Sequence, residues 1–132
     1  MLDRFVELAV DKVPVSNVIR LRDRGSAQIA VGEASGLYQA ARAVLMQTAR
    51  QIWGGRRGGR GLHPATPRRA TRGYVTAVRL AAQAVDLLHD AAGMTAVAAD
   101  GVLDRCWRDV HTMTQHTVLS PARLEVAGRV LL

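Results

Sequence analysis

At 132 residues, the chain has room for one domain, because a chain of this size buries roughly two thirds of the surface that its unfolded form would expose. Ala, Val and Leu carry most of the hydrophobic fraction of 48%, whereas aromatic residues make up only 4%. This composition favours closely packed helices over a β-sandwich, which needs more β-branched and aromatic side chains.

The net charge of +7 comes from 17 Arg and one Lys against 8 Asp and 3 Glu. Guanidinium groups present a planar fork of donors to anions, so this balance is compatible with a phosphate or nucleic-acid ligand. An Arg excess with abundant Ala, Gly and Val is also what a GC-rich coding sequence produces. Composition alone leaves both interpretations open.

Cysteine usage and hydropathy bear on the cellular compartment. The single cysteine, Cys106, excludes an internal disulfide. Charged residues at positions 3, 4 and 7 interrupt any apolar run at the N-terminus, so no signal peptide is predicted. The longest uncharged apolar stretch near the middle, Ala91–Ala99, falls far short of the ~20 residues that a membrane-spanning helix needs. We therefore expect a cytoplasmic protein without a membrane span.

A first short helix is predicted over Leu2–Val10, where apolar residues recur at helical spacing between charged ones. Pro14 limits its length, because the residue before a proline is pushed out of the α region. No capping residue precedes it, as if the chain started within a longer helix. The side chains expected to face inward are those of Leu2, Phe5, Val6, Ala9 and Val10.

An Arg-rich connector, Val13–Gly25, leads into a long helix predicted over Ser26–Trp53. Its apolar positions step by four and three, the seam spacing of helices packed in a bundle. They are Ala30, Ala34, Leu37, Ala41, Val44 and the run from Thr48 to Ile52. Gly32 and Gly36 lie one turn apart inside this helix, at a cost of roughly 1 kcal/mol each relative to Ala. A close approach by another helix is the expected compensation, and a frayed or bent first turn is the alternative.

Periodicity is lost over Gly54–Gly73, which holds six Gly, two Pro and six Arg in twenty residues. We predict a flexible loop there. A third helix follows from Tyr74 and ends at Gly93, a favourable C-terminal cap. Its inward positions are Tyr74, Val78, Ala81, Val85, Leu88 and Ala92, while Arg79, Gln83, Asp86 and Asp90 are expected to face away.

A fourth helix is predicted from Val102 to about Leu119. Its expected core positions are Leu103, Cys106, Trp107, Val110, Met113 and Thr117. Ser120 followed by Pro121 is typical of an N-cap and a first helical position, so a last helix is predicted from there through Leu132. No strand pattern or internal repeat occurs. The sequence therefore predicts an all-α, up-and-down helical bundle that forms a single domain over residues 1–132.

The segment RCWRDVHTMTQH (residues 105–116) gathers the polar side chains that could carry chemistry. Arg105, Asp109, Thr112 and His116 step by four, three and four, so they line one polar stripe. A solvated helix face would show the same pattern. His111 and His116 are about 140° apart around a helix, so they cannot jointly bind one metal as an i, i+4 pair can. We expect no metal site.

Three segments resemble the C-terminal domain of two-component flavin-dependent monooxygenases built on the acyl-CoA dehydrogenase fold, a family that includes aromatic and polyketide hydroxylases. They are AVDLLHDAAGMTAV (84–97), RCWRDVHTMTQH (105–116) and SPARLEVAGRVLL (120–132). The earlier LDRFVELA and LRDRGSAQIAVGEA are similar to the family's first two bundle helices. The best motif is the pair Arg108 and Asp109 with His116 seven residues after the Asp.

This resemblance implies reduced flavin, FMN or FAD, as the cofactor and a flavin reductase as a partner. It implies that His116 is the catalytic residue, placed beside the flavin ring and assisting proton transfer, a task for which an imidazole is suited at neutral pH. It also implies that Arg108, Asp109 and Thr112 lie on the cofactor side of this helix, with the Arg-Asp pair orienting the helix.

A second group of residues matches the place where related folds contact the flavin phosphates of a neighbouring subunit. It comprises Gln28 together with Arg22 or Arg24. The family's enzymes have an N-terminal helical domain and a middle β-barrel that supply most of the flavin pocket, and neither is present in this chain. We therefore expect an assembly domain that forms a homo-oligomer, a dimer or tetramer, and contributes part of a flavin site without being an active oxygenase by itself.

Other interpretations remain. An acyl-CoA dehydrogenase activity is disfavoured because none of the glutamates lies in the motif region. Polyanion or nucleic-acid binding could use the basic stretch Arg56–Gly61 with Arg68, Arg69 and Arg72, although this stretch has no aromatic residue to stack on bases. A purely structural, self-associating bundle is the third possibility, because an incomplete bundle leaves apolar surface bare.

Overall fold

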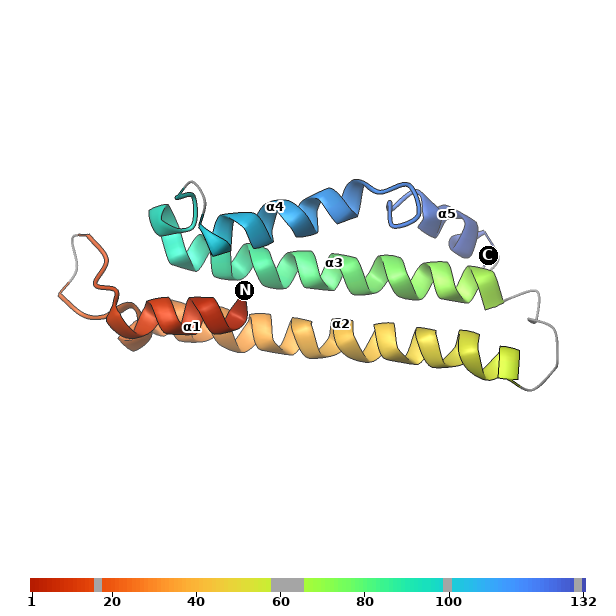
Figure 1. The fold of residues 1–132 in the computed structure, drawn as a ribbon, viewed down its shortest axis with the longest axis horizontal. Helices are drawn as coiled ribbons and strands as arrows, with labels where there is room; N and C mark the ends of the chain where they lie inside the picture. The colour runs from red at the N-terminus through yellow and green to blue at the C-terminus, as the bar shows by residue number, and fades with distance from the viewer. Residues whose placement is uncertain (16–17, 58–65, 99–100, 130–131) are drawn as a thin grey trace.

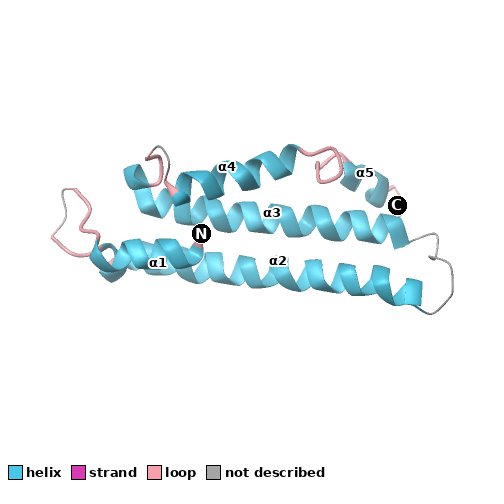
Figure 2. Ribbon diagram, in the orientation of Figure 1, coloured by secondary structure: helices cyan, strands magenta, loops and turns pink. Residues whose placement is uncertain are grey.

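The fold is described from a computed structural model, which defines residues 1–15, 18–57, 66–98, 101–129 and 132, and their side chains except at positions 55–57, 66–68 and 126. The helices are α1 (Leu2–Asp11), α2 (Gly25–Arg57), α3 (Thr66–Ala92), α4 (Val102–Gln115) and α5 (Arg123–Gly128), with 3-10 turns η1 (Leu21–Asp23) and η2 (Gly93–Thr95). The part of the chain so defined contains no strand (Figure 2). The predicted all-α bundle is confirmed.

Two long helices form the centre of the molecule. The α2 helix, of 33 residues, spans about 50 Å, and α3 returns antiparallel beside it as the second arm of a hairpin (Figure 1). The α4 and α5 helices lie along the side of α3 that faces away from α2. The α1 helix packs at the end of the hairpin where α2 begins and α3 ends. The chain thus runs up and down, with α3 between α2 and α4.

Alanine dominates the interface between α2 and α3. Its buried positions on α2 are among those that the step of four and three predicted. On α3 the prediction was partly wrong, because Tyr74, Val78, Ala81 and Val85 are only half-buried. Ala30, Ala34 and Ala41 are buried on α2, and Ala77 and Ala84 are buried on α3. Such small side chains let two helix backbones approach closely. The larger side chains are buried around α1 and the end of α3; Phe5 is fully buried and Leu88 nearly so, at 2% exposure. Of the expected inward residues of α1, Val6 and Val10 are exposed instead, because α2 and α3 cover only the Phe5 side.

The prediction of a flexible loop over Gly54–Gly73 is wrong at both ends of that range. The α2 helix continues to Arg57 and α3 already begins at Thr66, while residues 58–65 lie outside the described part of the chain. Packing of the two hairpin arms compensates for the helix-weakening glycines, and Pro67 stands in the first turn of α3, where a missing N–H costs nothing.

The close helix approach expected at Gly32 and Gly36 occurs instead at Gly73. A Cβ on Gly32 or Gly36 would meet nothing within 4 Å, whereas a Cβ on Gly73 would lie 1.9 Å from Oγ1 of Thr48. Gly73 is therefore a buried residue of α3 that faces α2, and not part of a loop. Thr48 is buried on α2 and its hydroxyl donates to the carbonyl of Val44 at 2.8 Å.

The C-terminal part differs in the helix ends. The α3 helix does end before Gly93, whose φ of +58° favours glycine. The α4 helix ends at Gln115, short of Leu119, and α5 begins at Arg123, after the predicted start at Ser120. Hydrogen bonds between residues i and i+3 form successive turns from 116 to 125, and these tight turns replace the predicted first turn of the last helix. No helix in the described ranges is long and apolar enough to cross a membrane.

Candidate functional site

The polar stripe predicted on the fourth helix faces solvent. Arg105, Asp109, Thr112 and His116 are all exposed, whereas Leu103 is buried on the opposite side of α4, against α3. The side chains of this outer face bond mainly within their own helix. Arg108 pairs with Asp104 at 2.9 Å, and the Thr112 hydroxyl donates to the carbonyl of Arg108 at 2.8 Å.

His116 caps the C-terminal end of α4 in an extended conformation, with φ −65° and ψ 133°. Its Nδ1 accepts a hydrogen bond from the backbone N–H of Val118 at 3.3 Å. A neutral imidazole that accepts at Nδ1 carries its hydrogen on Nε2. No described residue bonds to Nε2, so this atom can exchange a proton with a molecule outside the chain.

The residues predicted to contact flavin phosphates lie around the N-terminal end of α2. Arg24 follows η1 and lines a cavity of about 330 Å³ together with Ser26 and Asp90. Gln28 donates to the carbonyl of Arg22 at 3.1 Å. Arg22 and Gln28 line a second cavity of about 410 Å³. The other residues that line it are apolar: Phe5, Val6, Ala9, Val10, Ala27 and Val31.

The structure does not bring His116 together with Arg24 and Gln28. The α2 and α4 helices lie on opposite sides of α3, and α2 begins at the end of the bundle away from the C-terminal end of α4 (Figure 1). The six predicted site residues therefore form two separate regions, one on α4 and one at the start of α2.

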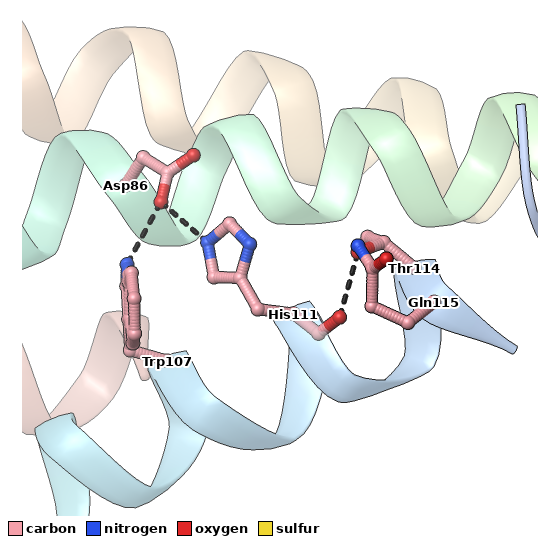
Figure 3. Close-up of polar contacts among 5 residues, drawn as sticks. All are labelled: Asp86, Trp107, His111, Thr114 and Gln115. Carbon is pink, nitrogen blue, oxygen red and sulfur yellow. Dashed lines mark hydrogen bonds and ion pairs between the residues drawn. The ribbon is translucent and has the colours of Figure 1, made fainter.

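A polar cluster between α3 and α4 was missed by the sequence prediction, which placed Asp86 on an outward face. Oδ1 of Asp86 accepts hydrogen bonds from Nε1 of Trp107 at 2.9 Å and from Nε2 of His111 at 2.8 Å (Figure 3). The Trp107 ring also packs against the imidazoles of His111 and His89, with centroids 4.4 and 5.3 Å apart. The available signal was the indole N–H of Trp107, which needs an acceptor once it is placed toward a core.

Two residues predicted in the core of the fourth helix are exposed. Met113 is 49% exposed, and Thr117 lies in the exposed turns after α4. The reason is that the surface of α4 facing α3 runs through Leu103, Trp107 and His111. Met113 lies away from that line.

Two further predictions concern metal and nucleic acid. Within the described residues, no group of three or more His, Cys, Asp or Glu side chains could hold a metal ion. Of the basic stretch, Arg69 and Arg72 are exposed on the first turns of α3. The side chains of residues 56–61 and of Arg68 lie outside the described part of the chain, so polyanion binding stays an untested prediction.

The architecture defines a helical domain whose polar face lies on its fourth helix. Residues 1–121 match the family described as the acyl-CoA dehydrogenase C-terminal domain. The chain belongs to this family. It is also 26% identical over 129 residues to an indole-3-acetate monooxygenase from Acinetobacter baumannii. That similarity covers 98% of this chain and 33% of the relative, so the chain spans about a third of the length of this relative.

Proposed function

We propose that this chain is the C-terminal bundle domain of a reduced-flavin-dependent monooxygenase, in which it contributes to oligomerisation and to part of a flavin site. The observation that carries the proposal is His116, which ends α4 with an exposed imidazole whose Nε2 has no partner among the described residues. The similarity to a monooxygenase over nearly the whole chain supports it.

The donors at the start of α2 suit the phosphate group of a flavin. Arg24 and Gln28 carry N–H groups near the N-terminal end of a long helix, where the helix dipole favours anions. Arg24 has no ion-pair partner among the described residues, although Asp90 lines the same cavity and opposes a second negative charge there. In the proposal, Arg24 and Gln28 hold the phosphate.

The residues on α4 suit the other end of the cofactor. A bound reduced flavin supplies the electrons for oxygen activation. His116 would exchange a proton at Nε2 with the flavin or the substrate hydroxyl, while Arg108 and Thr112 stiffen the helix through bonds within it. Asp109 is exposed, as His116 is. Because the two regions lie apart on one chain, a complete site requires a second chain or another domain.

A comparison of FMN with riboflavin tests the phosphate part of this proposal. We expect the chain to bind FMN more tightly than riboflavin, which lacks the phosphate, in a titration followed by flavin fluorescence. Arg24→Gln should reduce FMN affinity about tenfold and remove the preference, because it removes a charge-assisted hydrogen bond. The exposed Arg79→Gln on α3 is the matched control and should leave binding unchanged. Equal affinity for FMN and riboflavin, or no binding of either, would contradict the assignment.

A further inference from the structure

One carboxylate of α3 receives two side chains of α4. Oδ1 of Asp86 accepts from the indole N–H of Trp107 and from the imidazole of His111, which are one turn apart on the inner side of α4 (Figure 3). Both donors are half-buried between the helices. We refer to Asp86, Trp107 and His111 as the clasp.

The clasp determines which nitrogen of His111 carries hydrogen. An ionised carboxylate can only accept hydrogen bonds, so Nε2 of His111, at 2.8 Å from Oδ1, must be the donor. A neutral His111 is therefore the Nε2–H tautomer, and its Nδ1 is left as an acceptor. Figure 3 shows this second ring nitrogen on the side of the imidazole away from Asp86.

Ring packing reinforces the same connection between the helices. The Trp107 ring lies against His111 of its own helix and against His89 of α3, at interplanar angles of 45° and 35°. Tilted rings at centroid separations of this size attract one another beyond their burial. Trp107 is thus attached to α3 by its N–H and by its ring.

The clasp lies next to the helix end that carries His116. The backbone carbonyl of His111 accepts a hydrogen bond from the Thr114 hydroxyl at 2.6 Å, within the last turn of α4. His116 follows directly, with its backbone N–H bonded to the carbonyl of Met113 at 3.1 Å. On the outer face, by contrast, the Arg108–Asp104 pair connects α4 only to itself. Among the described residues, the polar attachment of α4 to α3 therefore passes through Asp86.

We infer that Asp86, Trp107 and His111 are positioning residues for His116: the Asp86 carboxylate fixes the His111 tautomer and holds the last turns of α4 on α3, so that the imidazole of His116 keeps its place at the helix end. The role of His116 in proton transfer rests on the proposed function. The structural coupling between Asp86 and His116 does not rest on that function, and it can be measured in this chain alone.

The test uses ¹⁵N NMR of the histidine rings together with amide hydrogen exchange of α4. At a pH high enough to keep both imidazoles neutral, His111 and His116 of the unmodified chain should each show widely separated Nδ1 and Nε2 signals with hydrogen on Nε2. Asp86→Ala should reduce this separation at both residues, toward the averaged chemical shifts of an imidazole that exchanges between its two tautomers. It should also accelerate exchange of the amides near the end of α4 about tenfold, because a charge-assisted attachment is lost.

Two matched variants separate the clasp from general destabilisation. Asp86→Asn keeps one acceptor oxygen and should restore most of the signal separation at His116. Asp104→Ala removes a carboxylate from the outer face of the same helix and should leave both histidines unchanged. Should Asp86→Ala fail to fold, Trp107→Phe and His111→Phe retain ring packing while removing one donor each, and both should shift the His116 signals.

The outcomes distinguish this inference from the proposed function. If the His116 signals stay fixed while those of His111 collapse, the clasp holds His111 alone and the inference is wrong. It is also wrong if His111 carries its hydrogen on Nδ1 in the unmodified chain. A failure to bind FMN would overturn the proposed function and would leave the ring signals and their response to Asp86→Ala untouched.

Discussion

Gly73 lies where the backbone of α3 comes close to a side chain of α2. A Cβ at this position would lie 1.9 Å from Oγ1 of Thr48 and 3.0 Å from its Cβ. The Thr48 hydroxyl is held by its bond to the Val44 carbonyl, so it cannot turn away without losing that bond. The methyl group of an alanine would therefore force the two long helices apart.

We expect Gly73→Ala to lower the free energy of unfolding by about 2–3 kcal/mol, because overpacking a tight contact displaces backbone. Urea unfolding followed by circular dichroism measures it. Adding Thr48→Ala should recover part of the loss, since the atom nearest to the new methyl group is gone. Gly54→Ala is the control on α2, because a Cβ there meets nothing within 4 Å, and it should stabilise the helix by about 0.5–1 kcal/mol. Equal effects of Gly73→Ala and Gly54→Ala would show that the contact is not tight.

At the residue scale, the sequence predicted which residues face inward or end a helix better than it predicted the residues that they contact. Periodicity placed Trp107 on the inner side of its helix, where it lies half-buried against α3. The preference of glycine for helix ends placed Gly93 after α3, and this placement is confirmed. The sequence placed Asp86 outward, because the pattern of one helix contains no information on a second face, which α4 covers here. It placed Gly73 in a loop, because glycine, proline and arginine interrupt the periodicity before Tyr74. Which helix covers a second face depends on the packing of the whole bundle.

The α1 helix is attached to the end of α3 by the only lysine of the chain. Nζ of Lys12 donates to the carbonyl of Ala92 and to the hydroxyl of Thr95. The Ala92 carbonyl belongs to the last residue of α3, at the negative end of the helix dipole. Burial lowers the pKa of Lys12 because it disfavours the charged ammonium. The two hydrogen bonds offset that desolvation.

Replacing Lys12 by methionine keeps most of the side-chain volume and removes both bonds. We expect Lys12→Met to lower the free energy of unfolding by about 1–2 kcal/mol, as for the loss of hydrogen bonds from a charged group. Hydrogen exchange should show the loss first in the amides of α1, since Lys12 holds that helix in place. Arg105→Met, on the exposed face of α4, is the control and should change stability by less than about 0.5 kcal/mol. A uniform loss of protection across all helices would contradict a local role for Lys12.

At the element scale, the sequence predicted the five α-helices that the described residues form and the alanine seam of α2, because periodic segments carry a strong signal. The helix ends were less well predicted. Glycine and proline argued for a loop up to Gly73, but contacts between the hairpin arms outweigh the weak intrinsic preferences of residues 54–57 and 66–73. Ser120 and Pro121 predicted a helix start at Ser120. Tight turns occupy these positions instead, and α5 begins at Arg123.

At the scale of the whole molecule, α2 presents a stripe of mostly small side chains on the side opposite its buried seam. Its members are all exposed: Ile29, Gly32, Gly36, Ala40 and Ala43. Small residues at helical spacing permit close contact with a second helix, and Ile29 is 63% exposed. This surface, the α2 stripe, supports the proposed oligomerisation.

We expect the chain to sediment as a dimer or tetramer and Ala40→Glu to sediment as a monomer, because a carboxylate in the α2 stripe would be desolvated without a partner. Alanine and glutamate have similar helix preferences, so the fold should persist. Gln83→Glu makes the same change in charge on an exposed position of α3 and should leave the assembly intact. A monomeric unmodified chain, or a fully assembled Ala40→Glu variant, would argue against the α2 stripe as the contact.

The candidate site shows what a single chain's sequence contains and what it lacks. Arg108 and Asp109 lie on α4 and His116 caps its C-terminal end, and the exposure of Asp109 and His116 agrees with the predicted polar stripe. The distance between His116 and Arg24 could not be predicted, because it depends on α3 lying between α2 and α4. The roles of these residues stay predictions until flavin binding is measured.

The contact between Lys12 and Ala92 joins residues 80 positions apart in the chain. During synthesis on a ribosome, α1 is made before α3, so the part of its docking surface that α3 supplies does not exist until those further residues have been added. At 5–20 residues per second this takes about 4–16 s. Throughout that time only η1 and the start of α2 can cover the apolar side of α1, and the part of this side that packs on α3 stays uncovered. The nascent helix is therefore a candidate for transient contact with chaperones, and Phe5 is the side chain such a contact would cover.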